Sequence, residues 1–152
     1  MGKVSARMEI SGQASDAEAL WYDHRRWPSF VDGCKHVAIV DGDWPAVGAR
    51  VVWDSYPGGR GRVMEQVVGY EARVGQSLAV EDEQIRGTQR VSFVPHQGGV
   101  TVSLELDYEL KQPRGKFGAF DLVFVRRPQR EALERTLRRF AREVRADRDP
   151  GL

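Results

Sequence analysis

The sequence has few residues that could form crosslinks or hold a metal. It contains one cysteine, Cys34, in 152 residues, which excludes an internal disulfide and leaves too few thiols for a structural zinc site. The three histidines, His24, His36 and His96, have neither HxH nor HxxxH spacing. We therefore expect no metal and no cofactor. The low cysteine content also fits a reducing cytoplasm.

Long apolar runs and a charge excess of either sign are also absent. No stretch approaches the about 20 apolar residues that cross a bilayer, and residues 1–12 do not resemble a signal peptide. The net charge of +1 gives no reason to expect nucleic acid as a partner. The arginine-rich segment 126–148 is interrupted by acids, as in a solvated helix face. These absences predict a soluble cytoplasmic protein without a transmembrane segment.

What the sequence does have is one very regular strand followed by one long amphipathic helix. Between Val100 and Leu110 every second residue is apolar, a period of two that is typical of a strand with one dry face. Farther on, apolar residues recur at helical spacing: Leu133, Leu137, Phe140, Ala141 and Val144. A sheet with one dry face needs a cover, and this helix is suited to be one.

The rest of the chain predicts one more strand, two short helices and five further strands before the regular one. Ser15 and Glu18 fit a capping box for the first short helix, and Pro28 lies near the start of the second. The final helix is expected to begin around residues 115–120 and to end near 146, with Pro128 marking a kink or a break. Nothing suggests a domain boundary, so residues 1–152 are expected to form one domain. The strands are expected at residues 4–12, 37–41, 49–56, 62–70, 77–82, 88–94 and 100–110.

Three stretches resemble the SRPBCC superfamily of START-related, birch-pollen-allergen-like and polyketide cyclase/dehydrase proteins. Residues 22–31 (YDHRRWPSFV) are similar to the segment after that family's first helix, and residues 47–53 (VGARVVW) to a strand that follows it. Residues 127–133 with Leu137 resemble its final helix. The resemblance covers residues 4–144 and implies an α+β helix-grip fold. In that fold a curved seven-stranded antiparallel sheet wraps around the C-terminal helix and encloses a hydrophobic cavity.

The aromatic residues are the main candidates for a cavity wall. They would either line a pocket for a flat or greasy ligand or simply fill the core. Tyr108 and Trp53 carry the polar groups that a buried ring would use. The full set of ligand-binding candidates is Trp27, Phe30, Val51, Trp53, Glu65, Phe93, Leu106, Tyr108, Phe120 and Phe124, and Phe117 belongs to the same aromatic group.

Glu65 and Asp82 are the acids of most interest. Glu65 shares a strand face with Val63 and Val67, and an inward carboxyl would have a raised pKa and could serve as a general acid. In the other register Met64, Gln66 and Val68 face inward and Glu65 lies in water. Glu65 and Tyr108 are the catalytic candidates.

Three functions remain open. The leading hypothesis is binding of a small hydrophobic molecule, such as a lipid, a quinone or a polyketide-like aromatic, between the sheet and the last helix. The second is an enzyme, a polyketide cyclase, aromatase or dehydratase that uses the same cavity. The third is a protein-interaction module whose cavity is filled. A homodimer is compatible with each of them.

Overall fold

The computed structural model describes residues 2–111 and 121–149, and side chains within the second range from residue 124 onward. Seven strands form one antiparallel sheet in the order β1-β7-β6-β5-β4-β3-β2. Two short helices follow β1, and a long helix ends the chain, which confirms the predicted order and the helix-grip architecture. The strands are β1 (Gly2–Ser11), β2 (Cys34–Asp41), β3 (Arg50–Ser55), β4 (Arg62–Glu71), β5 (Gly75–Glu81), β6 (Ile85–His96) and β7 (Gly99–Leu110). The helices are α1 (Ala14–Tyr22), the 3₁₀ turn η1 (His24–Arg26), α2 (Trp27–Phe30), the π-helical η2 (Asp121–Arg126) and α4 (Arg127–Arg148).

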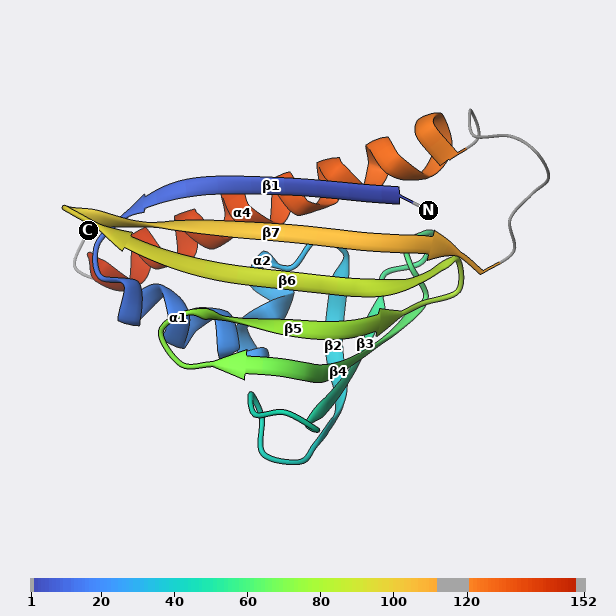
Figure 1. The fold of residues 1–152 in the computed structure, drawn as a ribbon, viewed down its shortest axis with the longest axis horizontal. Helices are drawn as coiled ribbons and strands as arrows, with labels where there is room; N and C mark the ends of the chain where they lie inside the picture. The colour runs from blue at the N-terminus through green and yellow to red at the C-terminus, as the bar shows by residue number, and fades with distance from the viewer. Residues whose placement is uncertain (1, 112–120, 150–152) are drawn as a thin grey trace.

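The alternation along β7 separates the two faces of the sheet. The apolar positions from Val100 to Tyr108 are at most 2% exposed, whereas the polar residues between them are half-buried on the opposite face. β7 lies between β1 and β6, so its dry side is continued by theirs. In Figure 1 the sheet curls, and β2 and β3 run at a steep angle to β7. The inner face therefore surrounds the helices instead of lying flat against them.

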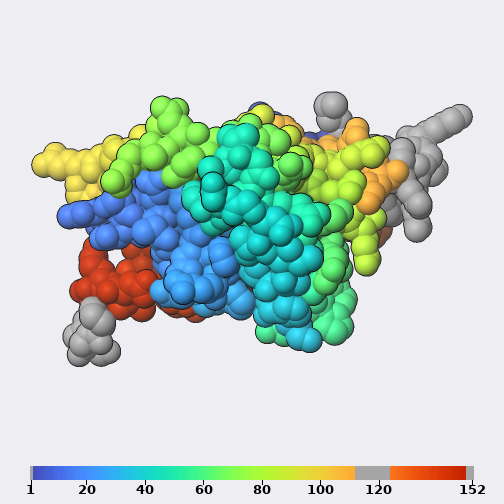
Figure 2. Space-filling view, turned by 90° about the horizontal axis from the view of Figure 1, so that it is seen from below, coloured from blue at the N-terminus to red at the C-terminus, as the bar shows by residue number. Residues whose placement is uncertain are grey.

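Helix α4 supplies the other half of the core. Leu137 and Phe140 are at most 1% exposed, and Leu133 and Val144 lie on the same buried stripe. The ring of Phe140 meets those of Trp21 in α1 and Phe30 in α2 at centroid distances of 5.2 Å. Figure 1 shows α4 running along β1 and β7, with α1 and α2 on the same side of the sheet. Figure 2 shows the surface of α1 and α2 (blue) lying against that of β2 and β3 (cyan), which closes this side of the interior.

The capping box predicted at Ser15 and Glu18 does not form. Gln13 is the N-cap of α1 and makes no side-chain capping bond, so Ser15 lies inside the first turn. The Glu18 carboxylate is buried and accepts a hydrogen bond from the backbone N–H of Arg73, at 3.0 Å. A long-range contact with the β4–β5 turn, where Arg73 has a positive φ of 72°, has therefore replaced the local one.

Two prolines lie where the sequence predicted them. Pro28 is in the first turn of α2, and Pro128 is in the first turn of α4, directly after the π-helical η2, so it marks the break between these two helical segments. The single cysteine, Cys34, begins β2, where burial raises the pKa of its thiol to about 12. A thiol with that pKa is not a nucleophile at neutral pH.

Candidate ligand-binding site

A small cavity lies between the inner face of the sheet and helix α4, and we call it the inner cavity. Its volume is about 50 Å³, enough for one or two water molecules at about 30 Å³ each. The sheet, the α2–β2 loop, the β3–β4 loop and α4 all contribute to its wall. The lining residues are Trp21, Trp27, Val31, Asp32, Trp53, Arg60, Glu65, Leu78, Gln89, Leu104, Gln129, Ala132, Leu133 and Thr136.

Glu65 is the more deeply buried of the two acids that line this cavity, the other being Asp32. Val63, Glu65 and Val67 are all buried, so β4 lies in the register that points Glu65 inward. On neighbouring β3, Trp53 faces the same way and its indole Nε1–H donates to Glu65 Oε1, at 2.9 Å. This indole is the one hydrogen-bond donor to Glu65 among the described residues.

The environment of Glu65 favours its protonated form. Burial is the largest influence and raises the pKa of the carboxyl. The hydrogen bond from Trp53 and the positive charge of Arg60 act in the opposite direction but are weaker. Glu65 therefore keeps its proton to a higher pH than an ordinary glutamate, as a general acid or a hydrogen-bond donor would require.

Arg60 brings a positive charge to the same cavity from the β3–β4 loop. Its Nε–H donates to Asp82 Oδ2, at 2.7 Å, and its guanidinium carbon lies 5.5 Å from the centroid of the Trp53 ring. Its Nη2 atom is buried and has no hydrogen-bond partner among the described residues. The loop can take this path because Gly61 has a φ of +73°, and a Cβ there would collide with Glu83.

Asp82 fixes Arg60 in place. Its side chain is 2% exposed, and its second oxygen accepts from the backbone N–H groups of Gln84 and Ile85, at 2.8 and 2.9 Å. Both carboxylate oxygens are thus occupied by groups of the protein. Asp82, which the sequence singled out as a candidate acid, holds the β5–β6 turn and the guanidinium and does not line the cavity.

Asp32, in the α2–β2 loop, ties the wall of the inner cavity to α4. The Asp32 carboxylate accepts from Arg135, at 3.0 and 3.1 Å, and from Arg139, at 3.2 Å. Its backbone N–H donates to the Thr136 hydroxyl, at 2.9 Å. Asp32 and Thr136 both line the cavity, so these bonds hold the α2–β2 loop and α4 together at its wall.

The structure brings some of the predicted site residues together and separates others. Trp27, Trp53 and Glu65 line the inner cavity. Phe124 is 65% exposed, so the prediction that it faces the interior is wrong, and Phe117 and Phe120 lie outside the described residues. The remaining candidates are buried in the core around the cavity without lining it: Phe30, Val51, Phe93, Leu106 and Tyr108.

The sequence reasoning missed five polar residues of the cavity: Asp32, Arg60, Gln89, Gln129 and Thr136. Gln89 could have been found, because it shares the inner face of β6 with Ile85, Val91 and Phe93. Arg60 could not, because a glycine-rich turn gives no indication of where its one long side chain points.

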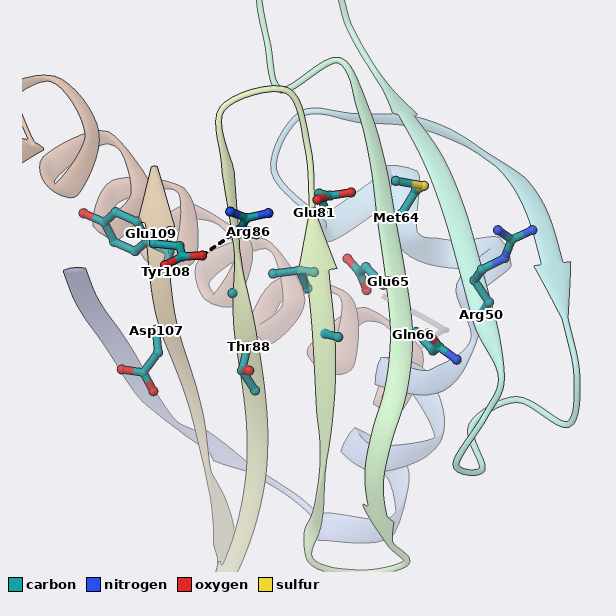
Figure 3. Close-up of a pocket in the computed structure, with 13 residues that line it drawn as sticks. Arg50, Met64, Glu65, Gln66, Glu81, Arg86, Thr88, Asp107, Tyr108 and Glu109 are labelled. Carbon is teal, nitrogen blue, oxygen red and sulfur yellow. Dashed lines mark hydrogen bonds and ion pairs between the residues drawn. The ribbon is translucent and has the colours of Figure 1, made fainter. Parts of the chain in front are cut away.

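A larger hollow lies on the opposite, outer face of the sheet. We call it the outer hollow, and its volume is about 630 Å³. Small residues such as Ala79, Gly87 and Thr88 form its floor, and long polar side chains of β4 to β7 stand around them (Figure 3). Its rim includes the exposed ion pair between Arg86 and Glu109, at 2.7 Å.

Neither region offers a metal site, since the described residues contain no group of three or more histidine, cysteine or acidic side chains able to hold an ion. His36 instead lies 3.1 Å from Asp54 on the surface. No helix within residues 2–111 and 121–149 is long and apolar enough to span a membrane.

Comparison with solved structures shows the same fold in other proteins. A START superfamily protein of Mycobacterium smegmatis is 20% identical, covers 94% of this chain and 97% of its own, and superposes with a TM-score of 0.76. A Thermus thermophilus protein is 21% identical over 96% and 99% of the two chains, with a TM-score of 0.79. Norcoclaurine synthase of Thalictrum flavum, solved with dopamine and hydroxybenzaldehyde, is 13% identical over 94% and 86%, with a TM-score of 0.69. At these identities the likeness shows the fold alone.

Comparison with curated protein sequences gives no match. The family model described as "Polyketide cyclase / dehydrase and lipid transport", however, matches residues 1–145, nearly the whole sequence. The helix-grip sheet and the cavity under α4 agree with that match. The chain therefore belongs to the polyketide cyclase/dehydrase and lipid transport family.

Proposed function

We propose that the protein binds a small hydrophobic molecule in the inner cavity, between the sheet and α4. The observation that carries this proposal is Glu65, a buried carboxyl with one hydrogen bond, in a wall otherwise dominated by tryptophan and aliphatic side chains. Burial of such a carboxyl costs stability, and a purely structural core has no need of it. Pockets for small molecules combine apolar walls with a few polar groups of this kind.

The inner cavity must widen to hold such a molecule. At about 50 Å³ it is far smaller than the about 300 Å³ of a typical ligand pocket. The α2–β2 loop and α4 meet at its wall through the bonds of Asp32 to Arg135, Thr136 and Arg139. We place the mouth of the cavity there, so that separating the loop from the helix opens the route inward. Burial of apolar ligand surface, at about 25 cal/mol for each Å², would offset the cost of opening.

The structural relatives support an aromatic ligand. Norcoclaurine synthase, which shares the fold, was solved with dopamine and hydroxybenzaldehyde, two aromatic compounds. In the present chain Trp21, Trp27 and Trp53 supply flat apolar surface to the cavity wall. An aromatic molecule would stack on such rings at little cost in conformational entropy.

Native mass spectrometry of the purified protein, followed by titration with a panel of naphthalenes and quinones, tests this proposal. Ala132→Phe, which fills the inner cavity, should abolish binding, whereas Ala79→Phe, in the outer hollow, should leave it unchanged. If Ala79→Phe blocks binding and Ala132→Phe does not, the ligand site lies on the other face of the sheet.

A second candidate function is catalysis in the same cavity, as in a polyketide cyclase or dehydratase. The raised pKa of Glu65 favours it, because a carboxyl that keeps its proton toward neutral pH can protonate a leaving oxygen. Glu65→Gln should then lower the rate of such a reaction at least about 100-fold while leaving substrate binding intact. Equal rates for the variant and the wild type would exclude Glu65 as the acid.

A further inference from the structure

We propose that the inner cavity selects neutral apolar molecules that carry a carbonyl oxygen, and that this oxygen accepts hydrogen bonds from Arg60 Nη2 and from the Glu65 carboxyl. This inference rests on the proposed binding function and adds the chemistry of the group that is recognised.

The first donor is Arg60. Its Nε–H is committed to Asp82 and its guanidinium lies over the Trp53 ring, so the side chain is held on two sides. The Nη2 group is nevertheless buried without a partner among the described residues. A buried donor without an acceptor costs free energy, and a ligand oxygen would remove that cost.

The second donor is Glu65. Its Oε1 accepts from the Trp53 indole, which favours placing the carboxyl proton on the other oxygen. Arg60, Trp53 and Glu65 all line the same cavity, and the charge of Arg60 acts on the Glu65 carboxyl, so we place both donors at a common space. Two donors call for an acceptor on the ligand, since the Asp32 carboxylate of the same cavity is already bound by Arg135 and Arg139.

The charges of the cavity favour a ligand with a carbonyl over a ligand with a charged group. The positive charge of Arg60 is already compensated by buried Asp82, at 2.7 Å. A ligand carboxylate would therefore add an uncompensated negative charge to the interior, and an ammonium group would face the guanidinium. A ketone or quinone oxygen accepts two hydrogen bonds and adds no net charge.

Three matched probes test the inference: 2-acetylnaphthalene, 2-ethylnaphthalene and 2-naphthoate, titrated against the full-length protein by calorimetry. The ketone should bind about tenfold more tightly than the ethyl compound, as expected for hydrogen bonds of about 1.4 kcal/mol in total, and 2-naphthoate should bind most weakly. If the ketone and the ethyl compound bind equally, or if 2-naphthoate binds best, the inference is wrong although the binding function stands. If none of the three binds, both fail.

Variants of Arg60 and Glu65 test whether these two donors cause the preference for the ketone over the ethyl compound. Arg60→Lys keeps a cation for Asp82 but removes Nη2, and Glu65→Leu removes the carboxyl, so each should reduce the ketone preference to about threefold or less. Glu65→Gln keeps a donor and should retain the preference. Arg86→Lys, at the rim of the outer hollow, is the matched control and should change nothing. Circular dichroism checks that each variant is folded.

The pH dependence separates a donor carboxyl from one that only fills space. Ketone affinity should fall as the pH rises through the pKa of Glu65, and Glu65→Gln should remove this trend. The other ionisable groups nearby are the Arg60–Asp82 pair, Asp32 with its arginines at the mouth, and Cys34, whose thiol pKa of about 12 keeps it protonated. A flat profile for the wild-type protein would overturn the role of Glu65.

Discussion

The inner cavity and the outer hollow lie on opposite faces of the same strands, and they differ in size and in chemistry. The outer hollow is about 630 Å³ and the inner cavity about 50 Å³. Around the outer hollow, Arg86 and Glu109 form an exposed ion pair that water screens. Inside, Glu65 is buried with one hydrogen bond, and Arg60 Nη2 is buried with no hydrogen-bond partner among the described residues. A buried polar group that lacks a hydrogen-bond partner indicates a ligand site better than the volume of a cavity does.

The largest difference between the two faces should appear in packing. Leu104 and Ser103 are neighbours on β7, the first on the inner face and the second on the outer. Leu104→Ala should lower the free energy of unfolding by about 4 kcal/mol, because it removes a side chain that is 1% exposed. Ser103→Ala should change it by less than about 0.5 kcal/mol. Urea denaturation measures both, and equal losses would contradict the assignment of the faces.

The second-largest difference should be in the stability that the ion pairs of the two regions contribute. Asp82→Ala leaves Arg60 and two turn N–H groups without their acceptor and should cost about 3 kcal/mol. Glu109→Ala breaks a pair whose side chains are both more than half exposed, so it should cost at most about 0.5 kcal/mol. The same denaturation experiment applies. If Asp82→Ala lowers the free energy of unfolding as little as Glu109→Ala does, Asp82 does not hold Arg60 in place.

Glu65 makes the stability of the inner face depend on pH. Its pKa is higher in the folded protein than in the unfolded chain, so the folded state binds the proton more tightly. Stability should therefore fall as pH rises from the unfolded pKa, near 4.5, to the folded one, by up to about 1.4 kcal/mol for each unit crossed. Glu65→Gln should not lose stability in this way. Its free energy of unfolding, relative to that of the wild type, should therefore increase as the pH rises. If the curves of stability against pH are parallel for the wild type and Glu65→Gln, the pKa of Glu65 is not raised in the folded protein.

The smallest effect is expected at the mouth of the inner cavity. Asp32→Asn weakens the bonds to Arg135 and Arg139 and should lower stability by about 1 kcal/mol while increasing the rate of ligand association. Glu134→Gln, which alters a loose exposed pair with Arg138 at 4.0 Å, is the control and should change neither quantity. Stopped-flow fluorescence measures the association rate. An unchanged rate for Asp32→Asn would place the access route elsewhere.

The sequence predicted the fold well because periodicity reports which face is buried. The alternation along β7 and the stripe from Leu133 to Val144 both correspond to buried positions. Phe124 is an exception. It lies in the π-helical η2, where the α-helical spacing of the stripe from Leu133 to Val144 does not apply, and the neighbouring Val125 is buried instead.

The site was less predictable, for physical reasons. Along β4 the two registers are about equally apolar, so only the pairing with β3 decides that Glu65 faces inward beside Trp53. Arg60 reaches the cavity because a distant acid, Asp82, holds it. Contacts between residues far apart in the chain leave no trace in local periodicity, and the polar half of this site is built from them.

The most direct test of the central claim is methyl and indole NMR with 2-acetylnaphthalene. A ligand in the inner cavity should shift the signals of the Trp53 indole N–H and of the methyl groups of Leu104 and Leu133, which all lie at that cavity. The methyl groups of Met64 and Thr88, at the outer hollow, should not move. Shifts confined to Met64 and Thr88 would contradict the account and place the ligand on the outer face of the sheet.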